Sequence, residues 1–306
     1  MLEATKAVPA GLDLKGASIA GEAGREWRRL LPATVAGLVE RWSLTIDAPF
    51  PGLSYNYVAP VTQADGTPAV LKLWMPLPRE FEVEVEALSL YDGNGAVKLL
   101  QVDADDRAML LERAEPGTDL WQLDDDDRQI EVAATVMRRL WRPPPLGCSL
   151  PHARAHYERL GAQLPGLAPA GFPLSWLATA LDIYAALESA APPVVLHEDL
   201  HQANILRARR EPWLAIDPHG LIGPRELETT QMVLNVVWRA EPAGWPRIIT
   251  RYVHALSEQL GLDTEQVRLA GVARSVLEAF WTLEDQPPGK AWQRDIAIAE
   301  SFAAAR

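Results

Sequence analysis

The chain has 306 residues, 48% of them hydrophobic and 23% charged, and a net charge of −12. This composition is typical of a soluble globular protein with room for two packed lobes, and the acidic balance argues against a nucleic-acid-binding protein and suits a cationic ligand. No apolar run approaches the ~20 residues of a membrane helix, no secretory signal is recognisable, and the single Cys148 cannot form an internal disulfide, so we expect a cytoplasmic protein without a membrane partner.

The first part of the chain predicts a helix followed by a small β-rich lobe. Residues 25–43 have apolar positions at helical spacing, and Pro32 is expected to interrupt or kink that helix. Residues 53–74 read as two strands joined by a turn at "ADGTP". Residues 80–91 alternate Val and Glu as a strand would, but their Glu, Ala and Leu content favours a helix. Residues 96–114 read as two short strands around the acidic turn "DADD".

The rest of the chain is predicted to be mainly helical. The segment 124–142 begins with four aspartates and ends with arginines, which matches the helix dipole at both ends. Further helices are expected at 173–189, 227–240, 246–260, 264–283 and 291–305. We therefore predict an α+β fold with a helical lead-in and β-rich lobe over residues 1–113 and a helical lobe over residues 114–306.

The segment "VVLHEDLHQANIL", residues 194–206, permits two chemical interpretations. His197, Glu198 and His201 match the HExxH pattern of zinc peptidases, which requires a helix so that both histidines face one way. The preceding "APPVV" favours a strand instead. The next histidine, His219, follows a turn, and no extended zinc-binding pattern is present.

The same segment also reads as the catalytic loop of a phosphotransferase. After the strand 194–196, the loop would carry Asp199 and Asn204. A hairpin formed by "ILRAR" and "WLAID", with Asp217 ending its second strand, would return the chain so that Asp217 arrives beside Asn204. A carboxylate near the attacking hydroxyl, with two oxygen ligands converging on a hard cation, is the arrangement that phosphoryl transfer needs.

These residues resemble a known family. "LHEDLHQANIL…WLAIDPHGLIG" is similar to the aminoglycoside phosphotransferases, and more narrowly to the streptomycin 6-kinase and hydroxyurea phosphotransferase group, which typically reads "HGDLHxxNIL…WxxIDPKGxxG". "AVLKLW", "LYDGNGAVKLL" and "MLLERAEPGTDL" also resemble that group. The resemblance covers roughly residues 50–290 and implies a protein-kinase-like fold with ATP in the cleft between the lobes.

Residue roles follow from the chemistry and the resemblance together. Asp199 is expected to orient the acceptor hydroxyl and take its proton, while Asn204 and Asp217 bind Mg²⁺. Lys72, an isolated lysine in an apolar strand, would grip the α- and β-phosphates. The resemblance implies that its partner is a glutamate on the following helix; Glu84 fits the spacing of the group best, with Glu80 and Glu86 as alternatives.

Other nucleotide contacts depend less on residue type. Backbone amides from Ser54 to Asn56, aided by the Ser54 hydroxyl, could cap a phosphate. Backbone groups of Glu112 and Ala114 in the hinge "LLERAEPG" would pair with adenine. Trp281, Glu284 and Asp285 are candidates to bind a cationic acceptor through cation–π and charge-assisted contacts; a helix end with a buried tryptophan explains them equally well.

Three positions depart from the pattern of the group. Glu198 stands where the group has glycine, His219 replaces a lysine, and "GPRELETT" lacks an aspartate that anchors the loop, for which Glu226 or Glu228 could substitute. We predict an ATP- and Mg²⁺-dependent kinase for a hydroxyl of a polar, cationic, streptomycin-like acceptor. The departures keep a second hypothesis open, a catalytically impaired, pseudokinase-like protein that binds a nucleotide or metabolite. The sequence indicates no oligomeric state.

Overall fold

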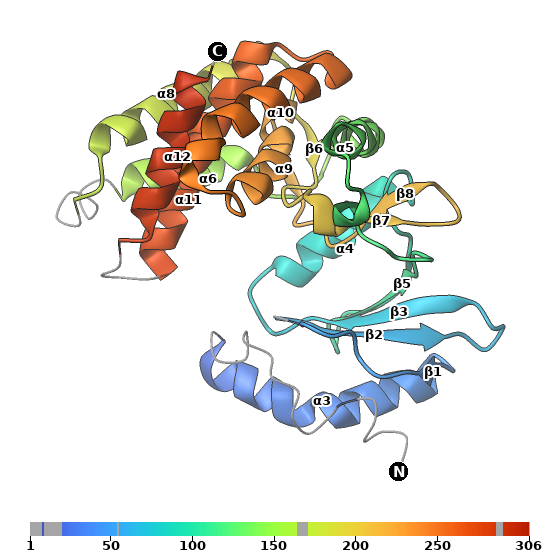
Figure 1. Cartoon of the computed structure of the whole chain (residues 1–306). Coiled ribbons are helices and arrows are strands. Elements are labelled where there is room, and N and C mark those ends of the chain that lie inside the picture. Colours follow the sequence, from blue (N-terminus) through green and yellow to red (C-terminus); the bar gives the residue numbers. More distant parts are fainter. Residues whose placement is uncertain (1–7, 9–19, 54, 164–170, 286–289, 306) are drawn as a thin grey trace. The chain divides into compact units, whose positions relative to one another are not determined.

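The computed structural model describes residues 8, 20–53, 55–163, 171–285 and 290–305 (Figure 1). The chain divides into two compact units, residues 1–117 and 118–306, and we describe each unit separately. The division falls four residues beyond the boundary predicted between residues 113 and 114. Within the described ranges, no helix combines the length and apolarity needed to cross a membrane.

The smaller unit is built on a five-stranded antiparallel sheet. Its strand order is β1-β2-β3-β5-β4. The bounds are Thr45–Ile46 for β1, Tyr57–Thr62 for β2, Pro68–Leu73 for β3, Leu99–Asp103 for β4 and Ala108–Glu112 for β5. Both predicted strand pairs are therefore confirmed, whereas β1 was not predicted.

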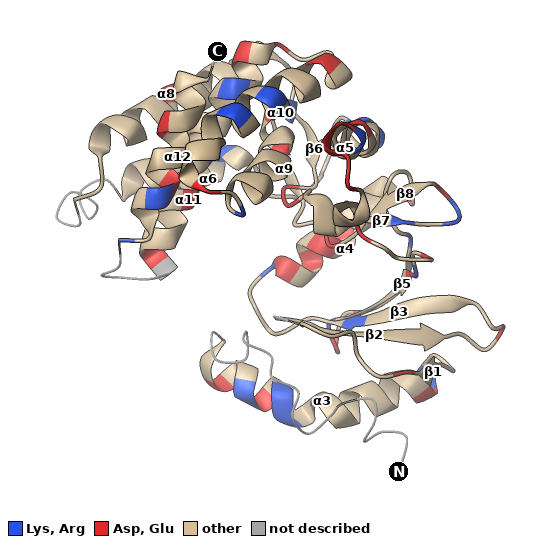
Figure 2. Ribbon diagram, in the orientation of Figure 1, with Lys and Arg blue, Asp and Glu red and all other residues tan. Residues whose placement is uncertain are grey.

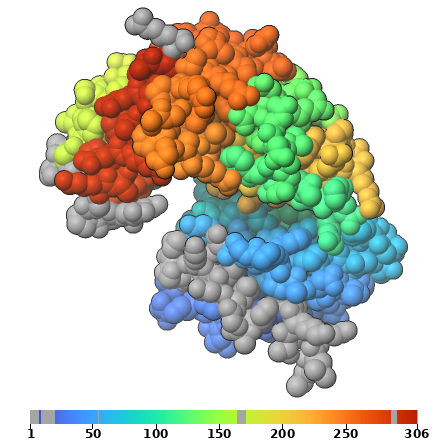
Figure 3. Space-filling view, viewed as in Figure 1, coloured from blue at the N-terminus to red at the C-terminus, as the bar shows by residue number. Residues whose placement is uncertain are grey.

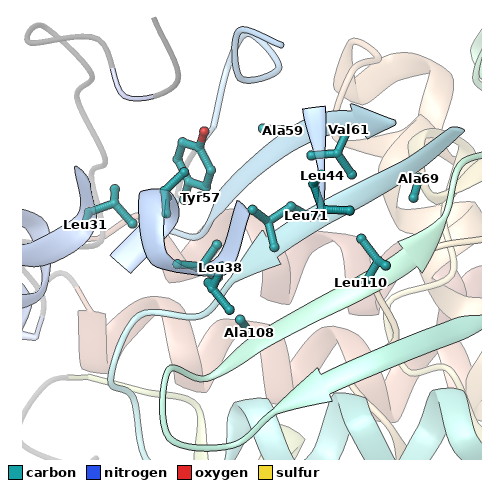
Figure 4. Close-up of a cluster of buried hydrophobic side chains, with 12 residues drawn as sticks. Leu31, Leu38, Leu44, Tyr57, Ala59, Val61, Ala69, Leu71, Ala108 and Leu110 are labelled. Carbon is teal, nitrogen blue, oxygen red and sulfur yellow. The ribbon is translucent and has the colours of Figure 1, made fainter. Parts of the chain in front are cut away.

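The helix α3, Gly21–Arg41, packs on this sheet through one apolar face. Leu31, Val35 and Leu38, spaced three or four residues apart, are buried in a common core with side chains of β2, β3 and β5 (Figure 4). Pro32 lies inside the helix without ending it. The predicted interruption is therefore wrong, and burial of residues on both sides of the proline explains why the helix continues.

The helix α4, Glu80–Tyr91, settles the ambiguous alternation of Val and Glu. Its buried positions recur at helical spacing, at Phe81, Glu84, Ala87, Leu88 and Tyr91. Figure 2 shows the acidic residues of this helix in red. One of its glutamates, Glu84, is on the buried face. The predicted helix is confirmed.

The larger unit is mainly helical. Its helices are α5 Asp126–Leu140, α6 Ala153–Ala162, α8 Leu174–Ala190, α9 Glu228–Val237, α10 Trp245–Leu260, α11 Thr264–Asp285 and α12 Trp292–Ala304. Three-residue 3₁₀ turns lie at Leu120–Gln122, Gln202–Asn204, Arg225–Leu227 and Pro242–Gly244. The five helices predicted after α5 are present, and α6 was not predicted.

The acidic run at 124–127 begins a helix, as predicted. Asp125 caps α5 by accepting hydrogen bonds from the backbone N–H groups of Asp127 and Arg128. Asp126 and Asp127 also bind Arg251 of α10. Figure 3 shows α5, in green, beside α10, in orange, on the surface of this unit. The run is thus part of helix capping and packing.

Candidate active site

The loop that follows β6 is held between two short antiparallel pairs. Strand β6, Val194–Leu196, pairs with β9, Leu221–Gly223. Strand β7, Ile205–Arg207, pairs with β8, Trp213–Ala215, in the predicted hairpin. The second strand ends at Ala215 rather than at Asp217, so Asp217 lies in the turn between β8 and β9. The pairing of β6 with β9 was not predicted.

This topology brings residues 197–204 against residues 216–220. The N–H groups of His219 and Gly220 donate to the carbonyl of His197, at 3.0 and 3.2 Å. At the other end of the loop, the N–H of Ile216 donates to the carbonyl of Asn204 at 3.0 Å. Because backbone bonds join the two segments at both ends, Asp199, Asn204 and Asp217 are carried by one small structural element.

Asp199 and Asn204 are in direct contact. The Asn204 amide nitrogen donates to the Asp199 carbonyl at 2.9 Å and to Asp199 Oδ2 at 3.1 Å. The Asp199 side chain is 26% exposed, and His201 Nε2 lies 3.6 Å from the same Oδ2. The amide nitrogen of Asn204 makes both bonds, so its amide oxygen is the atom that could bind a cation.

Asp217 is the second residue with a hard oxygen ligand. It lies in the left-handed region, at φ 59°, which turns the chain between β8 and β9. The negative charges of Asp199 and Asp217 both raise the pKa values of His197 and His219. The two carboxylates therefore act electrostatically on the same pair of histidines. A carboxylate and an amide oxygen suit Mg²⁺, which takes few protein ligands.

His197 is a structural residue of the loop. It is fully buried, and its Nε2 is 2.9 Å from the carbonyl of Ile216. Burial lowers the pKa of His197 to about 4, although the charge of Asp199 opposes this effect. His197 is therefore neutral at neutral pH and donates from Nε2, linking the loop to the turn that carries Asp217.

Glu198 takes the left-handed conformation that glycine would adopt freely. Its φ is 77°, which for an L-residue costs roughly 1 kcal/mol or more. Its side chain is 11% exposed, and both carboxylate oxygens are bound. Oε1 accepts from Arg274 Nη1 at 2.7 Å, and Oε2 lies 3.2 Å from His219 Nδ1.

Charge pairing changes the ionisation of both Glu198 and His219. Burial would raise the pKa of Glu198, but Arg274 and His219 hold it well below its usual range. Burial would lower the pKa of His219, but the hydrogen bond and charge of Glu198 raise it to about 9. The extra carboxylate beside Asp199 is therefore paired with the Arg274 guanidinium and with the His219 ring.

Glu228 of α9 anchors the backbone of the loop. Its Oε2 accepts from the backbone N–H of His197 at 2.6 Å, and its Oε1 accepts from that of Glu198 at 3.0 Å. Burial raises the pKa of Glu228 to about 7, and the two N–H donors oppose this shift. Of the two predicted substitutes for the missing aspartate, Glu228 binds the loop, whereas the side chain of Glu226 has no such contact among the described residues.

The geometry does not meet the requirement of a zinc peptidase. His197 and His201 lie on an irregular loop after a strand, not on a helix. Across the described parts of the chain, no three His, Cys, Asp or Glu side chains are arranged to hold a metal ion. The HExxH letters are thus an accident of sequence within a different loop.

The smaller unit contains a buried lysine with a carboxylate partner. Lys72 lies in β3 between Val58 of β2 and Met109 of β5. Its Nζ is 2.8 and 2.7 Å from the two oxygens of Glu84, and the residues are 4% and 1% exposed. The indole N–H of Trp74 donates to the same carboxylate, and Nζ lies 4.6 Å from the Trp74 ring. Glu84, the partner expected first among the three glutamates, is therefore paired with Lys72.

The other predicted nucleotide contacts differ in outcome. Ser54 lies outside the described residues. Glu112 ends β5, and its N–H donates to the carbonyl of Lys98 at 2.8 Å, so this N–H is not available to adenine. Ala114 follows in the segment that leads to the second unit, with its carbonyl close to Gly117.

The predicted acceptor residues on α11 already have internal partners. The Arg274 guanidinium lies 4.9 Å from the Trp281 ring, and the ring of His156 makes an edge contact with it at 5.5 Å. Glu284 binds Arg159 through both oxygens, at 2.6 and 2.7 Å. Asp285 is the last residue of α11, and its side chain lies outside the described part. A cationic acceptor at Trp281 or Glu284 would compete with these arginines.

Known proteins identify the class of fold. Solved structures of LicA, the choline kinase of Streptococcus pneumoniae, one of them in complex with AMP, align with TM-scores of 0.60 at 14% and 12% identity. They cover 90% and 88% of this chain and 98% of LicA. The fold is therefore protein-kinase-like, as predicted.

Sequence relatives identify the family. The model of the aminoglycoside/hydroxyurea antibiotic resistance kinases matches residues 41–286. Streptomycin 6-kinase of Streptomyces griseus is 35% identical over 97% of both chains. Hydroxyurea phosphotransferase of Kitasatospora aureofaciens is 37% identical over 92% of this chain and 81% of its own. The chain belongs to this kinase family and is a phosphotransferase that acts on hydroxyl groups of small molecules.

The sequence did not point to Arg274. It lies 76 residues from Glu198 and is 6% exposed on α11. The only signal in the sequence was indirect: Glu198 stands where the group has glycine. If that glutamate is buried, it requires a cationic partner. Nothing in the spacing shows which of the arginines supplies it.

Proposed function

We propose that this protein transfers the γ-phosphoryl group of ATP to a hydroxyl of a polar, cationic acceptor of the streptomycin type, with Mg²⁺ as cofactor. The observation that supports this most is the element formed by residues 197–204 and 216–220. It carries Asp199, Asn204 and Asp217 on two segments joined by backbone hydrogen bonds. The names of the relatives supply the acceptor class.

In this mechanism Asp199 accepts the proton of the acceptor hydroxyl. The oxygen then forms its bond to the γ-phosphorus as the bond to ADP breaks, and ADP leaves with the electron pair. Asn204 holds the Asp199 carboxylate through its amide nitrogen. Because the phosphoryl transition state needs little covalent help, the main task of these residues is to position the hydroxyl.

The cation would be bound by the Asn204 amide oxygen and the Asp217 carboxylate. Mg²⁺, when bound, neutralises charge on the β- and γ-phosphates. Lys72 would contact the α- and β-phosphates, and Glu84 keeps its ammonium group in place through two short contacts. Chelation should abolish turnover, and Asp217→Asn should raise the Mg²⁺ concentration needed for half-maximal rate.

The negative charge of the chain supports a cationic acceptor. The net charge is −12, and an acidic protein attracts cations from solution. Neutralisation of Glu198 by Arg274 and His219 counts against impaired catalysis, because Glu198 does not present an uncompensated charge to the γ-phosphate. We therefore favour an active kinase over a pseudokinase-like binding protein.

The test is a coupled assay of ADP formation with streptomycin, other aminoglycosides, hydroxyurea and sugar alcohols. Mass spectrometry of the acceptor shows whether a phosphoryl group was transferred. We expect turnover with streptomycin-type acceptors, loss of it in Asp199→Ala, and normal turnover in Asp182→Ala, which changes an exposed aspartate of α8. Nucleotide binding without transfer to any acceptor would contradict the proposal and favour a binding protein.

A further inference from the structure

Glu198, the residue before Asp199, is held by its backbone and by its side chain. Glu228 of α9 binds the backbone N–H groups of Glu198 and His197, which fixes the backbone direction at the start of the loop. The Glu198 side chain binds Arg274 of α11 and His219. A glycine would adopt φ 77° without any of these side-chain contacts, so the contacts with the carboxylate are an added constraint.

Arg274 is itself fixed in place. Its side chain is 8% exposed, its Nε donates to Glu278 Oε1 at 2.8 Å one helical turn along α11, and its guanidinium lies against the Trp281 ring. Glu278 also lies 3.4 Å from the Gln231 amide of α9. Contacts with α11, and through Glu278 with α9, therefore orient the guanidinium so that Nη1 donates to Glu198.

We propose that Arg274 is a positioning residue, which transmits the location of α11 through Glu198 to the neighbouring Asp199. The proposal rests on the catalytic role proposed for Asp199. Asp199 follows Glu198 directly, and rotation of a strained backbone would redirect its carboxylate. A displacement of about 1 Å at a reacting group can reduce a rate by about 100-fold. Arg274 would thereby keep Asp199 aligned without touching the substrate.

The experiment is a double-mutant cycle with ATP and streptomycin as the assayed substrates. Arg274→Met should reduce kcat by about 10- to 100-fold with the KM for ATP changed less than about threefold. We expect this loss because the buried Glu198 carboxylate, without the Arg274 guanidinium, would move and displace the loop that carries Asp199. In the Glu198→Gly background, Arg274→Met should change kcat by less than about threefold, because no carboxylate remains to be misplaced.

The matched control is Arg268→Met on the same helix. Arg268 is also little exposed and ion-paired, with Glu265, but it contacts the end of α12 rather than the loop. It should leave kcat within about twofold of the wild type, since its partners lie away from the loop. Arg274→Lys, which keeps the charge but loses the planar fork, should fall between the wild type and Arg274→Met, and it replaces Arg274→Met if that variant does not fold.

A second readout does not depend on catalysis. Hydrogen exchange of the peptide 194–206, which contains the two amides bound by Glu228, should be at least about tenfold faster in Arg274→Met. The double variant Glu198→Gly/Arg274→Met should exchange at the same rate as Glu198→Gly. Arg268→Met should exchange at the same rate as the wild type. An equal kcat loss in both Glu198 backgrounds, or unchanged exchange in Arg274→Met, would overturn the proposal.

If the wild type transfers phosphate to no acceptor, the proposed function fails and the exchange data alone decide the inference. Faster exchange in Arg274→Met that is reversed by Glu198→Gly would then support it. Exchange that is unaffected by Arg274 would reject it.

Discussion

Each unit contains a buried ion pair, one that includes the proposed phosphate-binding Lys72 and one that adjoins the proposed base Asp199, and the two pairs are constructed differently. In the smaller unit Lys72 and Glu84 are bound to each other on a strand and a neighbouring helix, with the Trp74 indole as a third member. In the larger unit Glu198 and Arg274 are part of a chain of contacts that continues to His219 and Glu278.

The difference shows what each pair depends on. Removing Lys72 takes a cation away from a carboxylate that is 1% exposed. Removing Glu198 leaves Arg274 in contact with Glu278 and with the Trp281 ring. Breaking a buried ion pair by removing one partner costs several kcal/mol, and the cost is smaller where the remaining charge keeps a second counter-charge, as Arg274 does with Glu278. The following predictions test this distinction, from the largest effect on stability to the smallest.

The largest effect is expected from Lys72→Met. The free energy of unfolding should fall by about 3–5 kcal/mol, because Glu84 would remain buried without the lysine ammonium group. Urea denaturation measures it. Lys72→Met/Glu84→Met should recover most of the loss, and Lys98→Met, at an exposed position of the same unit, should change stability by less than about 0.5 kcal/mol. Equal losses in the single and double variants would show that the charge is not the cause.

The next effect is a loss of stability in acid that originates at His197. Its pKa is about 4 in the folded chain and 6.5 in the unfolded chain, so the unfolded state binds a proton first. The stabilisation is complete above pH 6.5 and is lost as the pH falls toward 4. It should amount to about 2.5 kcal/mol between about pH 7 and pH 4.5.

The measurement compares unfolding of the wild type and His197→Gln at both pH values. The stability advantage of the wild type should shrink by that amount at the lower pH. His254→Gln, which changes an exposed histidine of α10, should show no such dependence. An advantage that is the same at both pH values would mean that His197 is not held neutral by burial.

Glu198→Gly should have a small effect despite the burial of the side chain. Relief of the positive φ is worth roughly 1 kcal/mol, which offsets the lost contacts with Arg274 and His219. We expect the free energy of unfolding to change by less than about 1 kcal/mol in urea denaturation. A loss as large as that in Lys72→Met would remove the distinction between the two pairs.

The smallest effect is expected at an exposed ion pair. Arg154 of α6 binds both oxygens of Glu188 of α8, at 3.0 and 2.8 Å, but its side chain is 59% exposed. Arg154→Met should lower the free energy of unfolding by less than about 0.5 kcal/mol, because solvent screens the pair. Differential scanning calorimetry would set this as the baseline for the buried pairs, and a loss above about 2 kcal/mol would invalidate that baseline.

Local patterns explain which parts of the fold could be predicted. The strands β2 and β3, the helix α4 and the capped start of α5 follow from turn residues, helix propensity and helix capping within short windows. The pairing of Lys72 with Glu84 was accessible through the resemblance to the family, whose spacing on the helix after the lysine strand favours Glu84 over Glu80 and Glu86. The continuity of α3 through Pro32 was not, since it depends on packing against the sheet.

The candidate site divides in the same way. The hairpin between Asn204 and Asp217 could be read from adjacent residues, and the alternatives Glu226 and Glu228 were both recognised. Arg274 could not be found, because α11 reaches Glu198 only through tertiary packing. The internal partners of Trp281 and Glu284 were also beyond sequence reasoning, since residues that can bind a cationic ligand can equally bind an arginine.

The most direct test of the proposed chemistry is the rate of phosphoryl transfer from ATP to streptomycin in Asp199→Asn. This variant keeps the shape of the side chain and removes the base. We predict a kcat at least about 100-fold below that of the wild type, with the KM for ATP within about threefold, and normal transfer in Asp182→Asn. A rate for Asp199→Asn within about tenfold of the wild type would contradict the assignment of Asp199 as the base.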